Sequence, residues 1–116
     1  MPLDRRPIEQ MVSDVGPEAF QRLAALFGAE TRTAVGEMAR LLARRDWREL
    51  GRQAHSLKNS TASFGLADLA ETARLLETAA DSGHGEEAAT QVTALQDTLA
   101  ESLAELDRFV REIGAR

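Results

Sequence analysis

The sequence contains no cysteine, and it has only three prolines and one tryptophan among its 116 residues. Without cysteine the fold can contain neither a disulfide nor a thiolate metal site, which fits a reducing compartment. No apolar run approaches the roughly 18 residues of a membrane-spanning helix, and the N-terminus lacks the charged and apolar order of a signal peptide. We therefore expect a cytoplasmic protein with no membrane partner.

Positive charge is scarce as well. The 14 arginine and lysine residues are outnumbered by 19 acids, which gives a formal net charge of −5. This charge repels a phosphate backbone, and the absence of tyrosine leaves little for base stacking, so we expect no nucleic-acid partner. The acids are unevenly distributed, because the segment Leu50–Ala67 contains none. An acid-free segment in an acidic chain indicates a binding site for an anion or for an acidic partner.

The spacing of the apolar residues predicts an all-α fold. Prolines occur only at positions 2, 7 and 17, so none interrupts a helix beyond residue 17. Apolar residues recur at intervals of three and four, as they do on a helix with one buried face. We predict a short helix over about 7–15, followed by helices over about 17–45, 46–64, 66–81 and 86–113.

Four amphipathic helices with short connections pack most simply as an antiparallel four-helix bundle, and the short N-terminal helix would then cover one end. Leu23, Trp47 and Val110 are expected to face the core of this bundle. Asp46 is a good N-cap, and Glu49 stands three residues later in a capping-box arrangement. A chain of 116 residues supplies one core, so we expect a single domain and a monomer, while a dimer through the last helix stays open.

His55 is predicted to be exposed on the third of these helices. It lies one step off the buried stripe through Ala54 and Leu57, and the residues one turn away, Gly51 and Asn59, are short, so the imidazole would project into solvent. Glycine inside a helix costs about 1 kcal/mol relative to alanine. We therefore expect another group to approach the helix closely at Gly51.

The only lysine of the chain, Lys58, lies three residues after His55. A neutral imidazole is a competent nucleophile near neutral pH, and its phosphorylation adds about two negative charges that Lys58 can reach. A metal site is disfavoured, since no carboxylate, cysteine or histidine lies three or four residues from His55. A hydrolytic triad is disfavoured because Ser56 faces another direction, and no GxxxxGK[ST] loop is present to bind ATP. A surface histidine beside a lysine, without any function, remains the alternative.

Several elements between Asp46 and Gly83 form one pattern. It consists of Asp46-Trp47, Ala54-His55-Ser56-Leu57-Lys58, the small residues Ser60-Thr61-Ala62-Ser63, Phe64-Gly65, and a leucine-rich stretch from Leu69 to Leu76-Glu77. This pattern resembles the core motif of histidine-containing phosphotransfer (HPt) domains, which are helical bundles. One residue departs from it, because many members have glycine where this chain has Asn59. The larger side chain would contact the phosphoryl group or narrow the choice of partner.

The resemblance implies a phosphorelay intermediate. His55 would accept a phosphoryl group on Nε2 from the aspartyl phosphate of a response-regulator receiver domain and pass it to the aspartate of another, with a hybrid histidine kinase as a further partner. Lys58 would stabilise the phosphoryl group. The receiver would supply Mg²⁺, so the chain would be a phosphocarrier with no cofactor or metal of its own rather than an enzyme. The candidate docking contacts around His55 are Arg48, Gly51, Arg52, Ser56, Asn59 and Ala62.

Two other interpretations stay open. The phosphorylated N-terminal domain of chemotaxis-type kinases resembles the same stretch, but the dimerisation and ATP-binding domains that accompany it are not in this chain. An adaptor from a different class would bind receiver-like or kinase partners without phosphotransfer. Its binding would depend on Arg52, Ser56 and the helix faces, and not on His55.

Overall fold

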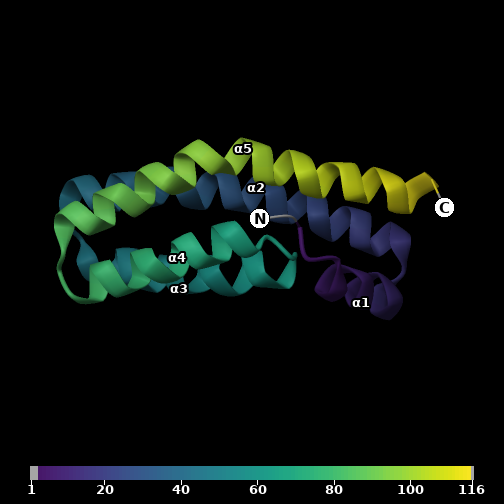
Figure 1. The fold of residues 1–116 in the computed structure, drawn as a ribbon, viewed down its shortest axis with the longest axis horizontal. Coiled ribbons are helices and arrows are strands. Elements are labelled where there is room, and N and C mark those ends of the chain that lie inside the picture. Colours follow the sequence, from purple (N-terminus) through teal and green to yellow (C-terminus); the bar gives the residue numbers. More distant parts are fainter. Residues whose placement is uncertain (1–2, 116) are drawn as a thin grey trace.

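The computed structural model describes residues 3–115, which form five helices (Figure 1). No strand occurs in this range, and the last four helices run antiparallel in turn, so the predicted all-α four-helix bundle is confirmed. The predicted helix ends lie within two residues of the observed ones. The helices are α1 (Arg5–Val15), α2 (Pro17–Arg44), α3 (Trp47–Ser63), α4 (Ala67–Asp81) and α5 (Gly85–Ala115).

The bundle is elongated because its helices differ in length. α2 and α5 have 28 and 31 residues, whereas α3 and α4 have 17 and 15. The two long helices therefore extend past the two short ones, and α1 packs against this extension at the end of the bundle (Figure 1). The resulting molecule measures 46 × 21 × 20 Å along its principal axes.

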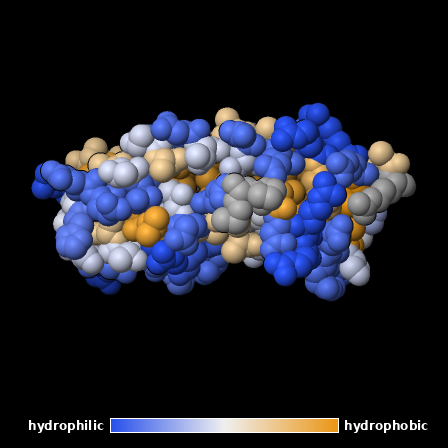
Figure 2. Space-filling view, in the orientation of Figure 1, coloured by the Kyte–Doolittle hydropathy of each residue, from blue (hydrophilic) through white to orange (hydrophobic). Residues whose placement is uncertain are grey.

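The core contains one apolar stripe from each helix. The face shown in Figure 2 is mostly hydrophilic, with small and separate hydrophobic areas, as expected when these stripes face inward. No helix among the described residues combines the length and the apolar character needed to cross a membrane. The fully buried large side chains are Ile8, Phe20, Met38, Leu50, Leu69, Leu76, Leu95 and Phe109.

Three residues that were predicted to face the core are not fully buried. Leu23 is 41% exposed, because the buried face of α2 passes through Ala24 instead. On α5, Phe109 fills the core in place of the half-buried Val110. Trp47 is half-buried, and its ring covers the start of α5, where Cη2 would lie 3.4 Å from a Cβ placed on Gly85. In the first two cases neighbouring apolar residues compete for one helical position, and the spacing alone does not decide between them.

The connection between α3 and α4 is tied to the N-terminal segment. The N–H of Asp4 donates to the Gly65 carbonyl oxygen at 2.8 Å, and the N–H of Leu3 donates to Glu105 Oε1 at 2.6 Å. Gly65 has a φ of +72°, and a Cβ placed on it would lie 2.0 Å from the Asp4 carbonyl oxygen. Phe64, just before it, stacks on Phe27 with ring centroids 4.2 Å apart. The Phe64-Gly65 step therefore anchors the end of α3 against α2 and the N-terminal segment.

Asp46 caps the start of α3, as predicted, because its side chain accepts a hydrogen bond from the N–H of Glu49 at 3.2 Å. The reciprocal half of the predicted capping box is missing. The Glu49 carboxylate binds Arg52 and Gln53 instead, and the N–H of Asp46 donates to the Leu41 carbonyl oxygen.

Replacing Asp46 with alanine should lower the free energy of unfolding by about 1 kcal/mol, because the first turn of α3 loses its side-chain acceptor. Urea unfolding followed by circular dichroism would measure the change. Asp97→Ala is the matched control, since Asp97 is exposed in the middle of α5. Equal effects of the two substitutions would contradict the capping role.

Candidate functional site

His55 lies on the exposed face of α3, and 53% of its side-chain surface is accessible. The prediction that it projects into solvent is confirmed. α3 has a different neighbour on each flank, because α2 packs on one side of it and α4 on the other. The groups that surround His55 therefore come from three helices.

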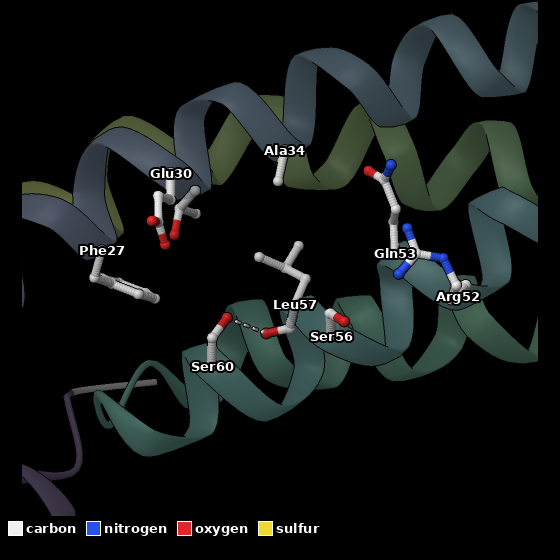
Figure 3. Close-up of a pocket in the computed structure, with 9 residues that line it drawn as sticks. Phe27, Glu30, Ala34, Arg52, Gln53, Ser56, Leu57 and Ser60 are labelled. Atoms are coloured by element: carbon white, nitrogen blue, oxygen red, sulfur yellow. Dashed lines mark hydrogen bonds between the residues drawn. The ribbon is translucent and has the colours of Figure 1, made fainter.

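On the α2 flank, a groove of about 340 Å³ lies between α2 and α3 (Figure 3). Ser56, the residue after His55, lines this groove together with Arg52. Glu30 and Ala34 line it from α2. Because Ser56 is the residue after His55 on α3, the groove adjoins the exposed histidine.

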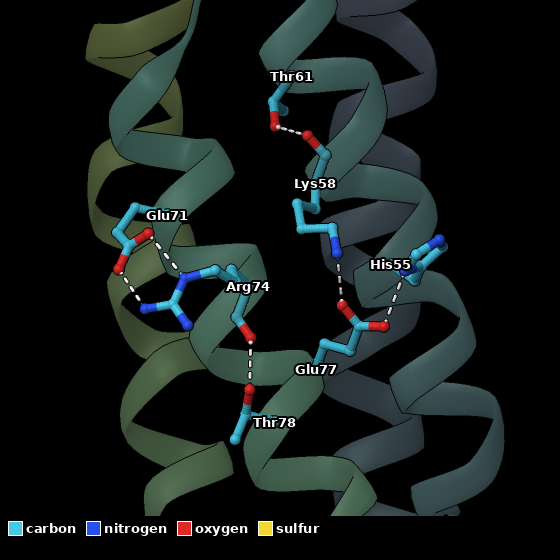
Figure 4. A network of polar contacts seen from close by, with 7 residues as sticks. All are labelled: His55, Lys58, Thr61, Glu71, Arg74, Glu77 and Thr78. Carbon is cyan, nitrogen blue, oxygen red and sulfur yellow. Dashed lines mark hydrogen bonds and ion pairs between the residues drawn. The ribbon is translucent and has the colours of Figure 1, made fainter.

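On the α4 flank, one carboxylate holds both of the predicted site residues (Figure 4). Oε2 of Glu77 lies 2.8 Å from Nδ1 of His55, and Oε1 of the same carboxylate accepts a hydrogen bond from Nζ of Lys58 at 2.9 Å. Glu77 is half-buried, with 22% of its side chain exposed. We call this arrangement of His55, Lys58 and Glu77 the carboxylate clamp.

The clamp determines which ring nitrogen of His55 is free. The hydrogen bond from Lys58, and then that from His55, hold the pKa of the Glu77 carboxyl below its usual 4.5 despite some desolvation. A carboxylate can only accept hydrogen bonds, so in the neutral imidazole the proton lies on Nδ1. Nε2 then keeps its lone pair, and it points away from α4 (Figure 4). The neutral ring therefore presents the lone pair of Nε2 on the side away from α4.

The sequence did not predict the role of Glu77. It is 22 residues from His55 and 19 from Lys58, so no local spacing connects them. The available signal was the Leu76-Glu77 pair at the end of the motif. Leu76 is fully buried, which turns the next residue of α4 toward the edge of α3.

Gly51 was expected on the docking surface, and this expectation was wrong because Gly51 is buried. A Cβ on Gly51 would lie 2.6 Å from Oδ1 of Asp81 and 3.7 Å from Cβ of Ala80. The close approach inferred from this glycine therefore exists, but the approaching group is α4 of the same chain. This contact brings α4 near enough for Glu77 to reach α3.

The other predicted docking residues are exposed on α3; they are Arg48, Arg52, Ser56, Asn59 and Ala62. The charge of Arg52 is already balanced, because its Nε donates to Glu49 at 2.9 Å and its Nη2 also contacts that carboxylate. These contacts lower the pKa of Glu49 to about 2. Acids that are outside the acid-free segment in sequence thus lie beside it in the fold. Among them are Glu49, Glu77 and Glu30.

Among residues 3–115, no group of three or more His, Cys, Asp or Glu side chains is arranged to hold a metal ion. The protein-family model described as the Hpt domain matches residues 22–108, which is three quarters of the chain. The matched range contains all of α3 and α4, and so the whole carboxylate clamp. No curated protein and no solved structure matches the chain.

Proposed function

Because the chain belongs to the Hpt domain family, we propose that His55 accepts a phosphoryl group from the aspartyl phosphate of one receiver domain and passes it to an aspartate of another. Hpt domains perform histidine phosphotransfer in phosphorelays, where they interact with receiver domains and kinases as phosphocarriers. The observation that carries the assignment to His55 is the carboxylate clamp. Glu77 holds Nδ1 of this exposed side chain, so in the neutral ring the lone pair of Nε2 is free to react.

The transfer step uses the lone pair of Nε2. This nitrogen attacks the phosphorus in line with the leaving oxygen, the N–P bond forms, and the P–O bond to the aspartyl carboxylate breaks. The carboxylate leaves with the electron pair of that bond. The ring keeps its proton on Nδ1 and gains positive charge, which the Glu77 carboxylate stabilises from 2.8 Å. Transfer to the next receiver reverses these changes.

Lys58 would stabilise the phosphoryl group on His55. Its side chain is half-buried, and its Nζ is bound to Glu77 at 2.9 Å, one helical turn from the histidine. An ammonium group has three donors, so Lys58 can keep its bond to Glu77 while it donates to a phosphoryl oxygen. The added charge of about −2 would attract it further.

The Mg²⁺ used in phosphoryl transfer would come from the receiver. Among the described residues, Glu77 is the one carboxylate that bonds to His55, and it already binds His55 and Lys58. These side chains therefore do not fit a Mg²⁺ site. The receiver would dock on the exposed face of α3 through Arg48, Arg52, Ser56, Asn59 and Ala62. Burial of at most about 1,200 Å² would suit a transient complex.

The test is to incubate the protein with a phosphorylated receiver domain and to measure its intact mass. Wild type should gain about 80 Da in an acid-labile form, and His55→Gln should gain nothing. His84→Gln is the matched control, since His84 is exposed in the α4–α5 turn, and it should be labelled like wild type. A label that persists in His55→Gln would contradict the assignment. If several receivers bind wild type and His55→Gln without labelling either, the adaptor function is favoured.

A further inference from the structure

The groove between α2 and α3 has an apolar floor. Phe27 and Leu57 are buried there, and Ala34 points into the groove from α2 (Figure 3). The hydroxyl of Ser60, on the wall, is turned back onto its own helix, where it donates to the Leu57 carbonyl oxygen at 3.2 Å. Thr31 and Gln53 also line the groove, but its floor is mostly apolar, and a volume of about 340 Å³ leaves room for an apolar side chain.

The two ends of the groove differ in charge. Arg52 stands at one end, where Glu49 neutralises it, and Glu30 stands at the other, near Phe27 and Ser60 (Figure 3). Glu37, farther along α2, is paired with Arg40 at 2.8 Å. Glu30 is exposed, and it has no hydrogen-bonding or ion-pair partner within residues 3–115. The uncompensated charge of this groove is therefore negative.

We propose that this groove selects the receiver partner by binding one of its helices, with an apolar side chain on the floor and a lysine or arginine of that helix beside Glu30. This inference rests on the proposed function, since the groove adjoins His55 through Ser56 and Arg52. Apolar anchors spaced along a helix suit a groove between two helices. A complementary charge at its end raises the rate of encounter and rejects partners that carry an acid there.

The location of the charge changes the kind of partner expected. The acid-free segment by itself indicated an acidic partner. In the fold, the one arginine that lines the groove is neutralised and Glu30 is not, so the groove favours a helix with a basic residue. The groove and the histidine thus have separate roles, because the groove chooses the partner and His55 reacts with it.

The test measures kcat/KM for transfer from a phosphorylated receiver that labels wild type. Glu30→Lys should lower kcat/KM by about tenfold at low salt, mainly through KM, and Glu30→Gln by about threefold. Glu101→Lys is the matched control, because it makes the same change of charge at an exposed position on α5. It should stay within about twofold of wild type. Ala34→Phe, which fills the groove without changing charge, should also slow transfer.

A charge exchange tests the pairing directly. A receiver in which a basic residue of the docking helix is changed to glutamate should transfer poorly to wild type and better to Glu30→Lys. Unchanged or faster transfer to Glu30→Lys from the unaltered receiver would overturn the inference, and so would an equal loss in Glu101→Lys.

Phosphoramidate separates the groove from the proposed function, because this small phosphoryl donor reacts with a histidine without docking a helix. It should label wild type, Glu30→Lys and Ala34→Phe at equal rates. Slower labelling of Glu30→Lys would mean that this substitution affects His55 itself. That result would overturn the proposed role of the groove but not the proposed function. If wild type is labelled on His55 by neither phosphoramidate nor receivers, the proposed function fails, and the inference fails with it.

Discussion

Gly65→Ala should lower the free energy of unfolding by about 3 kcal/mol, the largest effect on stability expected from any single methyl group added to this protein. Two causes act together. The backbone of Gly65 has a φ of +72°, which a residue with a Cβ adopts only with strain. The new Cβ would also lie 2.0 Å from the Asp4 carbonyl oxygen, a backbone atom that cannot rotate away. The bond from Asp4 N–H to Gly65 would then be lost.

Chemical denaturation would measure this change, with the fluorescence of Trp47 and the helical circular dichroism signal as two probes. Gly36→Ala is the matched control, because Gly36 lies within α2 and a Cβ there would meet no atom within 4 Å. It should raise stability by up to about 1 kcal/mol through helix propensity. If Gly65→Ala is no more harmful than Gly36→Ala, the N-terminal segment does not anchor the α3–α4 connection.

Glu77→Ala should slow transfer to His55 by between about tenfold and a hundredfold, although Glu77 never touches the phosphoryl donor. Without the carboxylate, the neutral ring no longer prefers the proton on Nδ1, so part of the population presents a protonated Nε2. The positive charge that develops on the ring also loses its nearest counter-charge. Glu77→Gln should lie between wild type and Glu77→Ala, because its amide oxygen can accept from one donor but carries no charge.

Nitrogen NMR of the imidazole distinguishes positioning from simple loss of structure. The Nδ1-protonated form should dominate in wild type and fall in Glu77→Ala. Glu71→Ala is the matched control, since Glu71 lies on the same helix and pairs with Arg74 instead (Figure 4). It should change neither the tautomer nor the transfer rate. An unchanged tautomer in Glu77→Ala, with normal transfer, would contradict the role given to the clamp.

The clamp also makes stability depend on pH in a definite direction. Folding lowers the pKa of Glu77 from its usual 4.5, so the contribution of its ionised form is complete above about that pH. The contribution is lost as the pH falls through the lower pKa of the folded state. Wild type and Glu77→Gln should therefore converge in stability under acid conditions.

The sequence predicted the helices and the exposed histidine because both depend on local periodicity. The three- and four-residue spacing decides that His55 lies one step off the buried stripe. The choice of Ala24 over Leu23 was not predictable, because both positions satisfy the spacing and packing against other helices decides between them. Glu77 and the burial of Gly51 were missed because both depend on how closely α4 approaches α3.

Charge was the property that the sequence predicted least well. A segment without acids suggested a basic surface, but a helix shares its surface with its neighbours. Glu77 from α4 and Glu30 from α2 reach the surface beside this segment, and Glu49 reaches it from one residue before the segment begins. The charge around a helical site therefore has to be read from the bundle and not from the linear segment.

The single exposed ring nitrogen of His55, on one face of one helix, also governs the order of events under the proposed function. Donor and acceptor receivers would need the same face, so they would compete for it and could not form a ternary complex. The carrier would have to release the first partner before it meets the second. An excess of unphosphorylated receiver would then slow the relay by occupying the carrier, and the flux would depend on how quickly each complex dissociates.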